Sequence, residues 1–276
     1  MSATFVEVAD RVYVLRRHLL DVNSTLIVGD TAALVVDTGA TAADATELVA
    51  AARRLTGRPW SVVNTHHHFD HCFGNRTVAG DPPAEVWAHQ EAARLLRRPV
   101  EVIRAEAYQE MAASHPRLAE RLNQAAVHPP DRTVTRTATV DLGGRTAQLW
   151  HPGRGHTIGD LVVHVPDADV LIAGDLVEQG APPTFDDAYP LEWPDTVAEM
   201  LRRLGPASVV VPGHGACVDA AFVQAQHTDL VALDWLIRQG HADGAPVDRV
   251  AAEAPFGPQV AAVAIARGYA ELGNRA

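Results

Sequence analysis

The chain has 276 residues, of which 47% are hydrophobic and 21% are charged, and its formal net charge is −11 at pH 7. This length is ample for one large α/β domain with a substantial core, and the composition is that of a folded globular protein rather than a disordered one. All basic side chains are arginine, and none of the arginine groups forms the basic stripe that nucleic-acid-binding proteins need, so we expect no nucleic-acid partner.

The sequence also predicts the cellular location of the protein. Its first residues lack the basic and apolar regions of a secretory signal, and no apolar run approaches the length of a transmembrane helix. Two cysteines, Cys72 and Cys217, are too few for a disulfide framework. We therefore expect a cytoplasmic protein with reduced thiols and no membrane association.

Short strands and one helix are predicted in the N-terminal quarter of the chain. Runs of β-branched residues bounded by turn residues predict strands at 11–17, 24–29, 32–37 and 60–65. The helical spacing of apolar residues at 41–55 predicts a helix, which Gly57 ends. The last of the four strands leads directly into the sequence THHHFDH.

The rest of the chain repeats this order of strands followed by a helix. A short strand is predicted at 85–89, followed by a helical insertion at about 89–130 that His115-Pro116 interrupts. Later strands are predicted at 133–142, 146–151, 161–166, 168–175 and 207–215. A helix is predicted at 195–204 and a mostly helical tail at about 219–276. This rhythm fits two sheets packed face to face with helices outside, and because no linker is evident we expect a single domain, 1–276.

Metal-binding side chains are concentrated at positions 66–71, which hold four histidines and one aspartate. The pattern His-x-His-x-Asp-His is matched by His66, His68, Asp70 and His71. Shifting the pattern by one residue fails because Phe69 would become a ligand. In an extended segment, residues two apart point the same way, so His66, His68 and Asp70 lie on one side and His67 on the other. His67 is therefore interpreted as exposed or hydrogen-bonded rather than as a ligand. His71 joins the others only if the chain turns after Asp70.

Four ligands in one loop can begin two metal sites but cannot complete them, because catalytic zinc takes about three protein ligands and a water. Three further candidates lie at predicted strand ends beside glycine, which lets the backbone turn close to an ion. They are His156 in GHTIGD, Asp175 in LIAGD and His214 in PGHG. Each alone is also explained as a turn or capping residue. Together, and in this order, they predict a metal centre.

The combination of HHHFDH, GHT, GD and PGHG resembles the metallo-β-lactamase superfamily, from about Asp37 to His214. The resemblance implies an α/β fold, a four-layer αββα sandwich of two mixed sheets with helices on the outer faces. It places the site at one edge, between the sheets.

The resemblance also implies a role for each ligand. The first metal would be held by His66, His68 and His156. The second would be held by Asp70, His71 and His214. Asp175 would bridge the two. Asp37, in the VVDTG segment, would orient a ligand imidazole by a hydrogen bond, although a capped strand end explains it equally well.

Departures from the family pattern narrow the function. β-Lactamases of the commonest subclass carry cysteine at the position of Asp175. An aspartate at this position is found instead in glyoxalase II-like and lactonase-like hydrolases. Glyoxalase II-like enzymes recognise a glutathione conjugate through basic residues in a C-terminal helical region. The tail at 219–276 has no matching basic motif, so thioester specificity is not supported.

Two bridged zinc ions lower the pKa of bound water from about 16 to around 7 and so create a nucleophile at neutral pH. The hydroxide would attack a carbonyl carbon, and the first metal would stabilise the developing oxyanion. Asp70 is expected to accept the proton of the hydroxide and to orient it. The sequence therefore predicts a dinuclear zinc hydrolase, with β-lactamase-like activity as a secondary possibility.

Two segments are expected to shape the substrate pocket, the insertion and the loop after Asp175. Their candidate pocket residues are Tyr108, Met111, Phe185, Tyr189 and Trp193. These side chains favour a small, partly apolar ester, lactone, thioester or amide, but they are also explained as core residues.

One alternative on the same fold is a mononuclear iron persulfide dioxygenase, whose Fe²⁺ would use His66, His156 and Asp175. The complete ligand set favours two zinc ions, because a mononuclear site does not need His71 or His214. A non-catalytic protein of this fold would be expected to have an incomplete set. The sequence leaves the native metal, the substrate and a possible homo-oligomer open.

Overall fold

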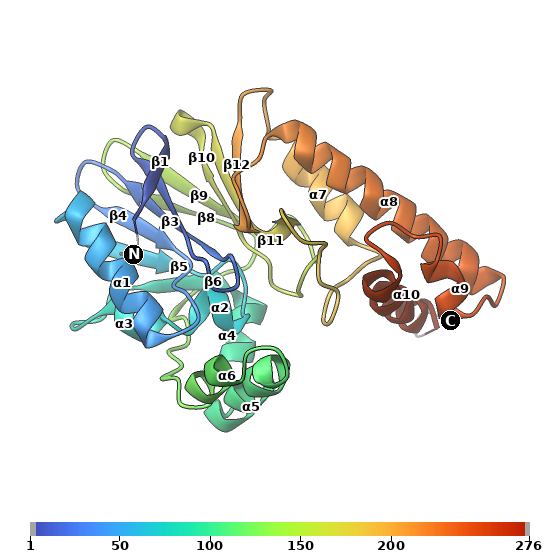
Figure 1. Cartoon of the computed structure of the whole chain (residues 1–276). Helices are drawn as coiled ribbons and strands as arrows, with labels where there is room; N and C mark the ends of the chain where they lie inside the picture. The colour runs from blue at the N-terminus through green and yellow to red at the C-terminus, as the bar shows by residue number, and fades with distance from the viewer. Residues whose placement is uncertain (1–3, 274–276) are drawn as a thin grey trace.

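Two mixed β-sheets pack face to face in the computed structural model, which describes residues 4–273 (Figure 1). The first sheet contains, in spatial order, β1 (Val6–Ala9), β2 (Val12–Arg16), β3 (Asn23–Val28), β4 (Ala33–Val36), β5 (Trp60–Val63), β6 (Val86–His89) and β7 (Arg132–Val134). The second contains β12 (Val209–His214), β11 (Val170–Glu178), β10 (Val162–Val165), β9 (Thr146–Trp150) and β8 (Thr137–Asp141).

Both sheets mix parallel and antiparallel pairs. Strands β1 to β4 are antiparallel and β4 to β7 are parallel, whereas in the second sheet only β11 and β12 are parallel. Parallel neighbours need a crossover connection, and helices supply it. The helices are α1 (Ala42–Leu55), α2 (Phe69–Cys72), α3 (Asn75–Ala79), α4 (Gln90–Leu96), α5 (Val100–Ala112), α6 (Pro116–Leu122), the 3₁₀ helix η1 (Pro166–Ala168), α7 (Trp193–Leu201), α8 (Ala220–Ala242), α9 (Val247–Ala251) and α10 (Pro258–Gly273).

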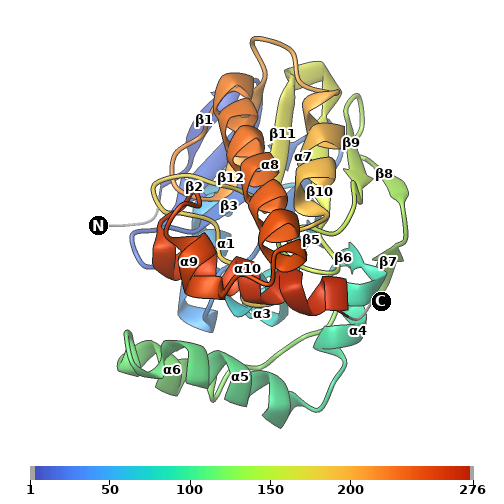
Figure 2. The same cartoon turned by 90° about the vertical axis from the view of Figure 1, so that its right-hand side faces the viewer.

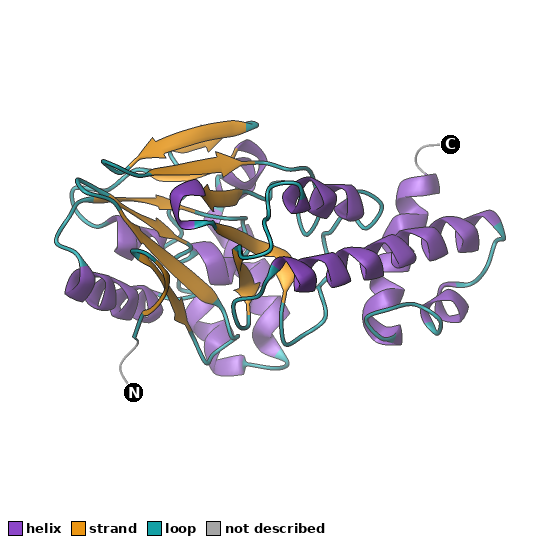
Figure 3. Ribbon diagram, turned by 90° about the horizontal axis from the view of Figure 1, so that it is seen from above, coloured by secondary structure: helices purple, strands orange, loops and turns teal. Residues whose placement is uncertain are grey.

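Three apolar clusters separate the four layers. Side chains alternate across each strand, so Leu34 and Val36 of β4 face the second sheet, while Ala33 and Val35 pack with α1. On the opposite side of the molecule, Trp193 and other residues of α7, α8 and α10 cover the second sheet. The layers are visible in Figures 1 and 3. This arrangement confirms the predicted four-layer αββα sandwich.

A fourth cluster attaches helices α5 and α6 to the HHHFDH segment. Phe69 and Phe73, at and just after α2, pack with Ile103, Leu118 and Leu122 of these two helices. Figure 2 shows α5 and α6 on one side of the sandwich, away from its outer helices. The insertion between β6 and β7 therefore contacts the segment that carries the metal-binding motif.

Two predicted strands differ from the structure. Residues 133–142 form two strands in different sheets, because β7 pairs with β6 whereas β8 pairs with β9. β11 continues to Glu178 instead of ending at Asp175. In the described part of the chain, no helix combines the length and apolar character needed to cross a membrane.

Candidate metal centre

The HHHFDH segment connects β5 to α2 at the edge where the parallel strands of the first sheet end. His68 precedes α2 with extended backbone angles (φ −67°, ψ 148°), and Asp70 and His71 lie within the helix. The chain therefore turns at Phe69, before Asp70 rather than after it as the sequence predicted. The turn brings His71 to the same centre as the residues before it.

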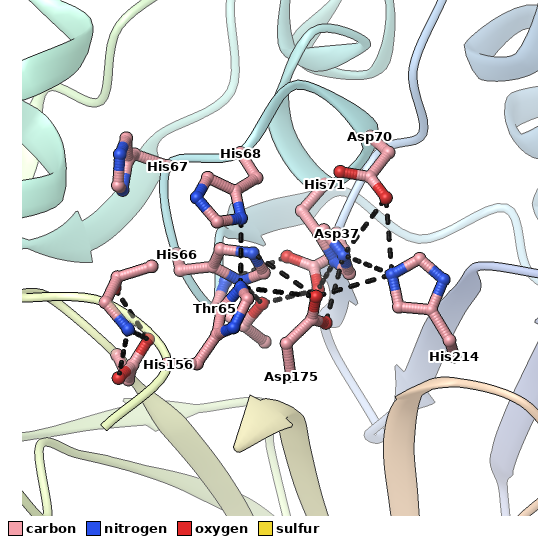
Figure 4. Close-up of polar contacts among 12 residues, drawn as sticks. Asp37, Thr65, His66, His67, His68, Asp70, His71, His156, Asp175 and His214 are labelled. Atoms are coloured by element: carbon pink, nitrogen blue, oxygen red, sulfur yellow. Dashed lines mark hydrogen bonds and ion pairs between the residues drawn. The ribbon is translucent and has the colours of Figure 1, made fainter. Parts of the chain in front are cut away.

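Three histidines and Asp175 form the first half of the centre (Figure 4). Nε2 of His156 lies 2.9 Å from Nδ1 of His68. Oδ2 of Asp175 lies 3.6 Å from Nε2 of His66 and 3.4 Å from Nε2 of His156. One donor atom from each of the four lies within 4.8 Å of the others. Ligand distances of about 2.0–2.2 Å allow donors so spaced to share one zinc ion.

Asp70, His71 and His214 form the second half, again with Asp175. Nε2 of His214 lies 3.3 Å from Nε2 of His71 and 3.3 Å from Oδ2 of Asp70. Asp175 lies between the halves: Oδ1 is 3.1 Å from Nε2 of His71, and Oδ2 is 3.3 Å from Nε2 of His214. The structure thus brings together all seven predicted ligands, and Asp175 contacts both groups.

The hydrogen bonds on the far side of the rings fix which nitrogen carries the proton. Nδ1 of His71 faces Oδ2 of Asp37 at 2.8 Å, and Nδ1 of His214 faces the carbonyl oxygen of Leu20 at 2.6 Å. Both nitrogens must donate to these acceptors, so both Nε2 lone pairs point at each other. Two facing lone pairs repel unless a cation lies between them.

Buried donor atoms without a partner support the same conclusion. Among the described residues, Nε2 of His66 and Oδ1 of Asp175 are buried and form no hydrogen bond. Buried polar groups normally have a partner, because an unpaired one costs free energy. Both atoms face the centre, so a metal ion there would satisfy them.

The charges at the centre favour a cation. Burial lowers the pKa of His66 and brings that of His156 to about 4, which keeps both imidazoles neutral and able to coordinate a metal. Burial also acts on His71, but the carboxylates of Asp175, Asp70 and Asp37 outweigh it and raise its pKa well above the usual value. In the absence of a metal, a proton takes the place of the cation.

The comparison with known families agrees with this geometry. A sequence model described as the metallo-β-lactamase superfamily matches residues 19–214, which include all seven side chains. The chain belongs to the metallo-β-lactamase superfamily. Membership implies metal ions, typically zinc, and the donor set described above fits them.

Individual relatives within the superfamily match a shorter stretch. The metallo-beta-lactamase type 2 of Bacillus cereus is 30% identical over 104 residues, which are 37% of this chain and 41% of that protein. The protein of the same name in Bacteroides fragilis is 30% identical over 89 residues, 31% of this chain and 36% of that protein. The chain thus spans about two fifths of the length of the curated relatives that it matches.

Solved metallo-β-lactamases share the fold over a longer stretch. The metallo-beta-lactamase from Pontibacter korlensis has a TM-score of 0.66 and 22% identity, and the match covers 83% of this chain and 99% of that one. The metallo-beta-lactamase DIM-1 has a TM-score of 0.63 and 21% identity, with 83% and 96% covered. At this identity, the likeness extends to the fold alone.

Asp37 supports the second half of the centre in this superfamily member. Besides His71, its carboxylate accepts hydrogen bonds from the backbone N–H of Thr65 (2.8 Å) and from the Thr65 hydroxyl (2.7 Å). The Thr65 hydroxyl oxygen lies 3.0 Å from Nδ1 of His66. Asp37 adopts a left-handed backbone conformation (φ 61°), which is uncommon for a residue other than glycine. Asp37 therefore orients one ligand directly and another through Thr65.

Sequence reasoning missed Asp187, which orients His68. Oδ1 of Asp187 lies 3.2 Å from Nε2 of His68, so Nδ1 of this ring is free to coordinate a metal. Carboxylates commonly support ligand histidines in this way. Asp187 lies in the long loop between β11 and α7, which the sequence predicted to shape the pocket without indicating this residue.

Asp160 was also missed, although it belongs to the quoted GHTIGD motif. Its carboxylate accepts hydrogen bonds from the backbone N–H of Thr157 at 3.0 Å and 3.1 Å and from the Thr157 hydroxyl at 2.6 Å. These bonds close the turn that carries His156. Asp160 therefore fixes the position of one ligand from the loop itself.

His67 lies apart from the ligands. Figure 4 shows its ring pointing away from the cluster, and its closest charged neighbour is Asp187, at 3.4 Å. Burial lowers the pKa of His67 to about 3, so the ring is neutral. Its alternation with His66 and His68 is that expected of an extended segment.

Beside the second half of the centre lies a cavity of about 420 Å³. Its lining includes Met111, one of the predicted pocket residues, and the ligands His68, Asp70, Asp175 and His214.

The structure places the other four predicted pocket residues elsewhere. Phe185 and Trp193 are fully buried in the core that covers the second sheet, and the ring of Tyr189 stacks on Arg154. Neither these three nor Tyr108 is among the residues that line the cavity. Phe185 and Trp193 are core residues because the helices on the outer face of the second sheet need apolar side chains to pack on.

Proposed function

We propose that this chain is a dinuclear zinc hydrolase that cleaves a small, partly apolar ester, lactone, thioester or amide. The observation that carries the proposal is the pair of imidazoles, His71 and His214, whose lone pairs face each other at 3.3 Å beside the shared carboxylate of Asp175. A single metal at the first half would leave this pair without a cation. Two metals satisfy every donor.

Zinc ions held here would supply a hydroxide nucleophile at neutral pH and a Lewis acid for the carbonyl oxygen. The side chains of the seven predicted ligands would bind these ions. His66, His68 and His156 would hold one ion, and Asp70, His71 and His214 would hold the other. Asp175 contacts both groups of ligands and would hold both ions.

Asp70 is suited to accept a proton from the attacking water. It lines the cavity, and its carboxylate lies 3.3 Å from Nε2 of His214 in the second half of the centre. Replacing Asp70 by asparagine keeps the size of the side chain and one oxygen donor. We expect Asp70→Asn to lower kcat by 10²-fold or more, as loss of a general base does. A variant that keeps both metals and full turnover contradicts this role.

Metal quantification of protein purified without chelator tests the proposal first. We expect two zinc ions per chain and hydrolysis of at least one lactone, ester, thioester or amide in a screen of small substrates. One iron per chain with oxygen uptake would instead identify the persulfide dioxygenase. That reaction leaves the pair of His71 and His214 without a role.

A β-lactamase-like activity is the second candidate, and the names of the curated relatives favour it. Hydrolysis of a chromogenic cephalosporin by the zinc-loaded protein tests it directly. Turnover of the cephalosporin far above that of simple esters and lactones would make it the principal activity.

A further inference from the structure

The cavity beside the metal centre is lined by carboxyl groups and by no basic side chain of the described chain other than histidine. The carboxyl groups belong to Asp21, Asp70, Glu110, Asp175 and Glu178. The chain contains no lysine, and no arginine lines the cavity. A substrate carboxylate would therefore find no counter-charge among the side chains around it.

Three of the five carboxylates are already engaged. Asp21 forms two hydrogen bonds with Arg16, at 2.5 Å and 2.6 Å. Asp70 and Asp175 contact the ligand imidazoles. Glu110, on α5, lies at the exposed rim. Glu178 is the remaining group.

Glu178 is the last residue of β11, and only 7% of its surface is exposed. Among the described residues, its carboxylate forms no hydrogen bond or ion pair. The side-chain amide of Gln226 pairs with the backbone, accepting from the N–H of Glu178 (3.0 Å) and donating to the carbonyl of Leu176 (2.8 Å). The carboxylate is thus left facing the cavity.

The carboxylate of Glu178 lies close to the metal centre. One of its oxygens lies within 4.8 Å of the donor atoms of Asp175 and His214. Because this carboxyl group lines the cavity and pairs with no side chain of the described residues, it is available to a polar group of a substrate that enters the cavity.

We propose that Glu178, assisted by Glu110 at the rim, binds an ammonium or a neutral hydrogen-bond donor of the substrate next to the scissile carbonyl. The site accordingly selects cationic over neutral, and neutral over anionic, acyl compounds. The reaction in this inference rests on the proposed hydrolase function, whereas the charge preference in binding does not. Penicillins and cephalosporins carry a carboxylate, so they should be poor substrates.

A series of acetate esters of similar size whose alcohol part carries a positive charge, no charge or a negative charge tests the preference. Acetylcholine carries a fixed cation, 3,3-dimethylbutyl acetate has the same shape without charge, and 3-acetoxypropionate carries an anion. Hydrolysis by the zinc-loaded protein is followed by acid release. We expect kcat/KM to fall in this order, with a ratio of tenfold or more between cation and anion, because carboxylates around the cavity attract the cation and repel the anion.

The decisive variant is Glu178→Gln, which removes the charge and keeps the shape. We expect it to lower kcat/KM for acetylcholine by about tenfold and to raise that for 3-acetoxypropionate. Glu101→Gln is the matched control, because Glu101 is exposed on α5 and does not line the cavity. An unchanged cation-to-anion ratio in Glu178→Gln overturns the inference. Loss of zinc in this variant alone also overturns it, since Glu178 would then be a metal ligand.

A binding measurement separates failure of the inference from failure of the proposed function. Ketone analogues of the three esters, with a methylene group in place of the ester oxygen, bind without being hydrolysed. Calorimetry with the zinc-loaded wild type should give tightest binding to the cationic ketone, and Glu178→Gln should abolish the difference. A protein that shows this binding but hydrolyses no ester, lactone or amide contradicts only the hydrolase function. Equal binding of the three ketones contradicts the inference, whatever the turnover.

Discussion

Oδ2 of Asp37 lies 2.8 Å from Nδ1 of His71, and this contact determines which nitrogen of the ring faces the metal centre. Asp37→Asn keeps the size of the side chain but replaces one acceptor oxygen by a donor. We expect the affinity for the second zinc to fall about 10–100-fold, as for other groups that support metal ligands. Competition with a chromogenic chelator measures this affinity.

Asp229→Asn is the control for this variant, because Asp229 is exposed on α8 and is not one of the metal-binding residues. Equal zinc affinity in the two variants would show that Asp37 only caps the end of β4.

Asp187 supports the first half of the centre through Nε2 of His68. Asp187→Ala leaves this nitrogen without an acceptor, so we expect weaker binding of the first zinc, again by about tenfold or more. Asp186→Ala removes a neighbouring carboxylate that is exposed and has no contact with His68. If both variants bind zinc like the wild type, Asp187 has no part in orienting the ligand.

His67 and His68 are adjacent but differ in orientation, and their variants should differ accordingly. His68→Ala removes a donor atom from the first half, and we expect it to lose at least one zinc and nearly all activity. His67→Ala should retain two zinc ions and most of the turnover, because its ring points away from the centre. Zinc content by elemental analysis distinguishes them, and loss of metal from His67→Ala would show that the ligand register is shifted.

Gly213, in the PGHG sequence, has no room for a side chain. A Cβ at this position would lie 1.7 Å from Oδ1 of Asp175, so Gly213→Ala must displace the Asp175 carboxylate. We expect fewer than two zinc ions per chain and a loss of about 1–3 kcal/mol in the free energy of unfolding. Elemental analysis and chemical denaturation measure the two effects.

Gly205→Ala is the corresponding control, because the nearest atoms to its added Cβ lie 3.7 Å and 3.9 Å away. Both variants add one methyl group near the second sheet. Equal zinc content in the two would mean that Asp175 does not need its observed position.

Zinc binding should be coupled to proton release. In the metal-free protein, the carboxylates around His71 and His214 outweigh burial and raise the pKa of both imidazoles, so the pair binds protons near neutral pH. This pairing stabilises the metal-free fold fully below the unfolded pKa of about 6.5, and the contribution is lost as pH rises through the raised folded values. Metals must displace these protons, so zinc affinity should increase with pH.

Calorimetric titration in two buffers of different ionisation enthalpy counts the protons released. We expect release at pH 7 and a steady loss of affinity between about pH 8 and pH 6. Affinity that does not change with pH, with no proton release, would contradict the pairing of these imidazoles with the carboxylates.

Much of the fold and of the centre was predictable from local sequence. Runs of apolar and β-branched residues in strands such as β4 predicted the strands of the two sheets, and HHHFDH, GHTIGD, LIAGD and PGHG contain the seven predicted ligands. Local patterns did not predict the structure where it depends on which distant strand a segment pairs with. The segment at 133–142 has one continuous strand pattern, yet β7 and β8 pair with strands of different sheets.

The sequence by itself determined which side chains could bind metal, because the spacing of donors within one loop follows from the geometry of the backbone. Only the tertiary structure decided which residues support them and which line the cavity. Asp187 contacts His68, which lies 119 positions earlier in the chain. Phe185 and Glu178 are seven positions apart, yet the side chain of Phe185 packs in the apolar core whereas that of Glu178 lines the cavity. Such contacts depend on the packing of elements that are far apart in the chain, and no short-range pattern encodes them.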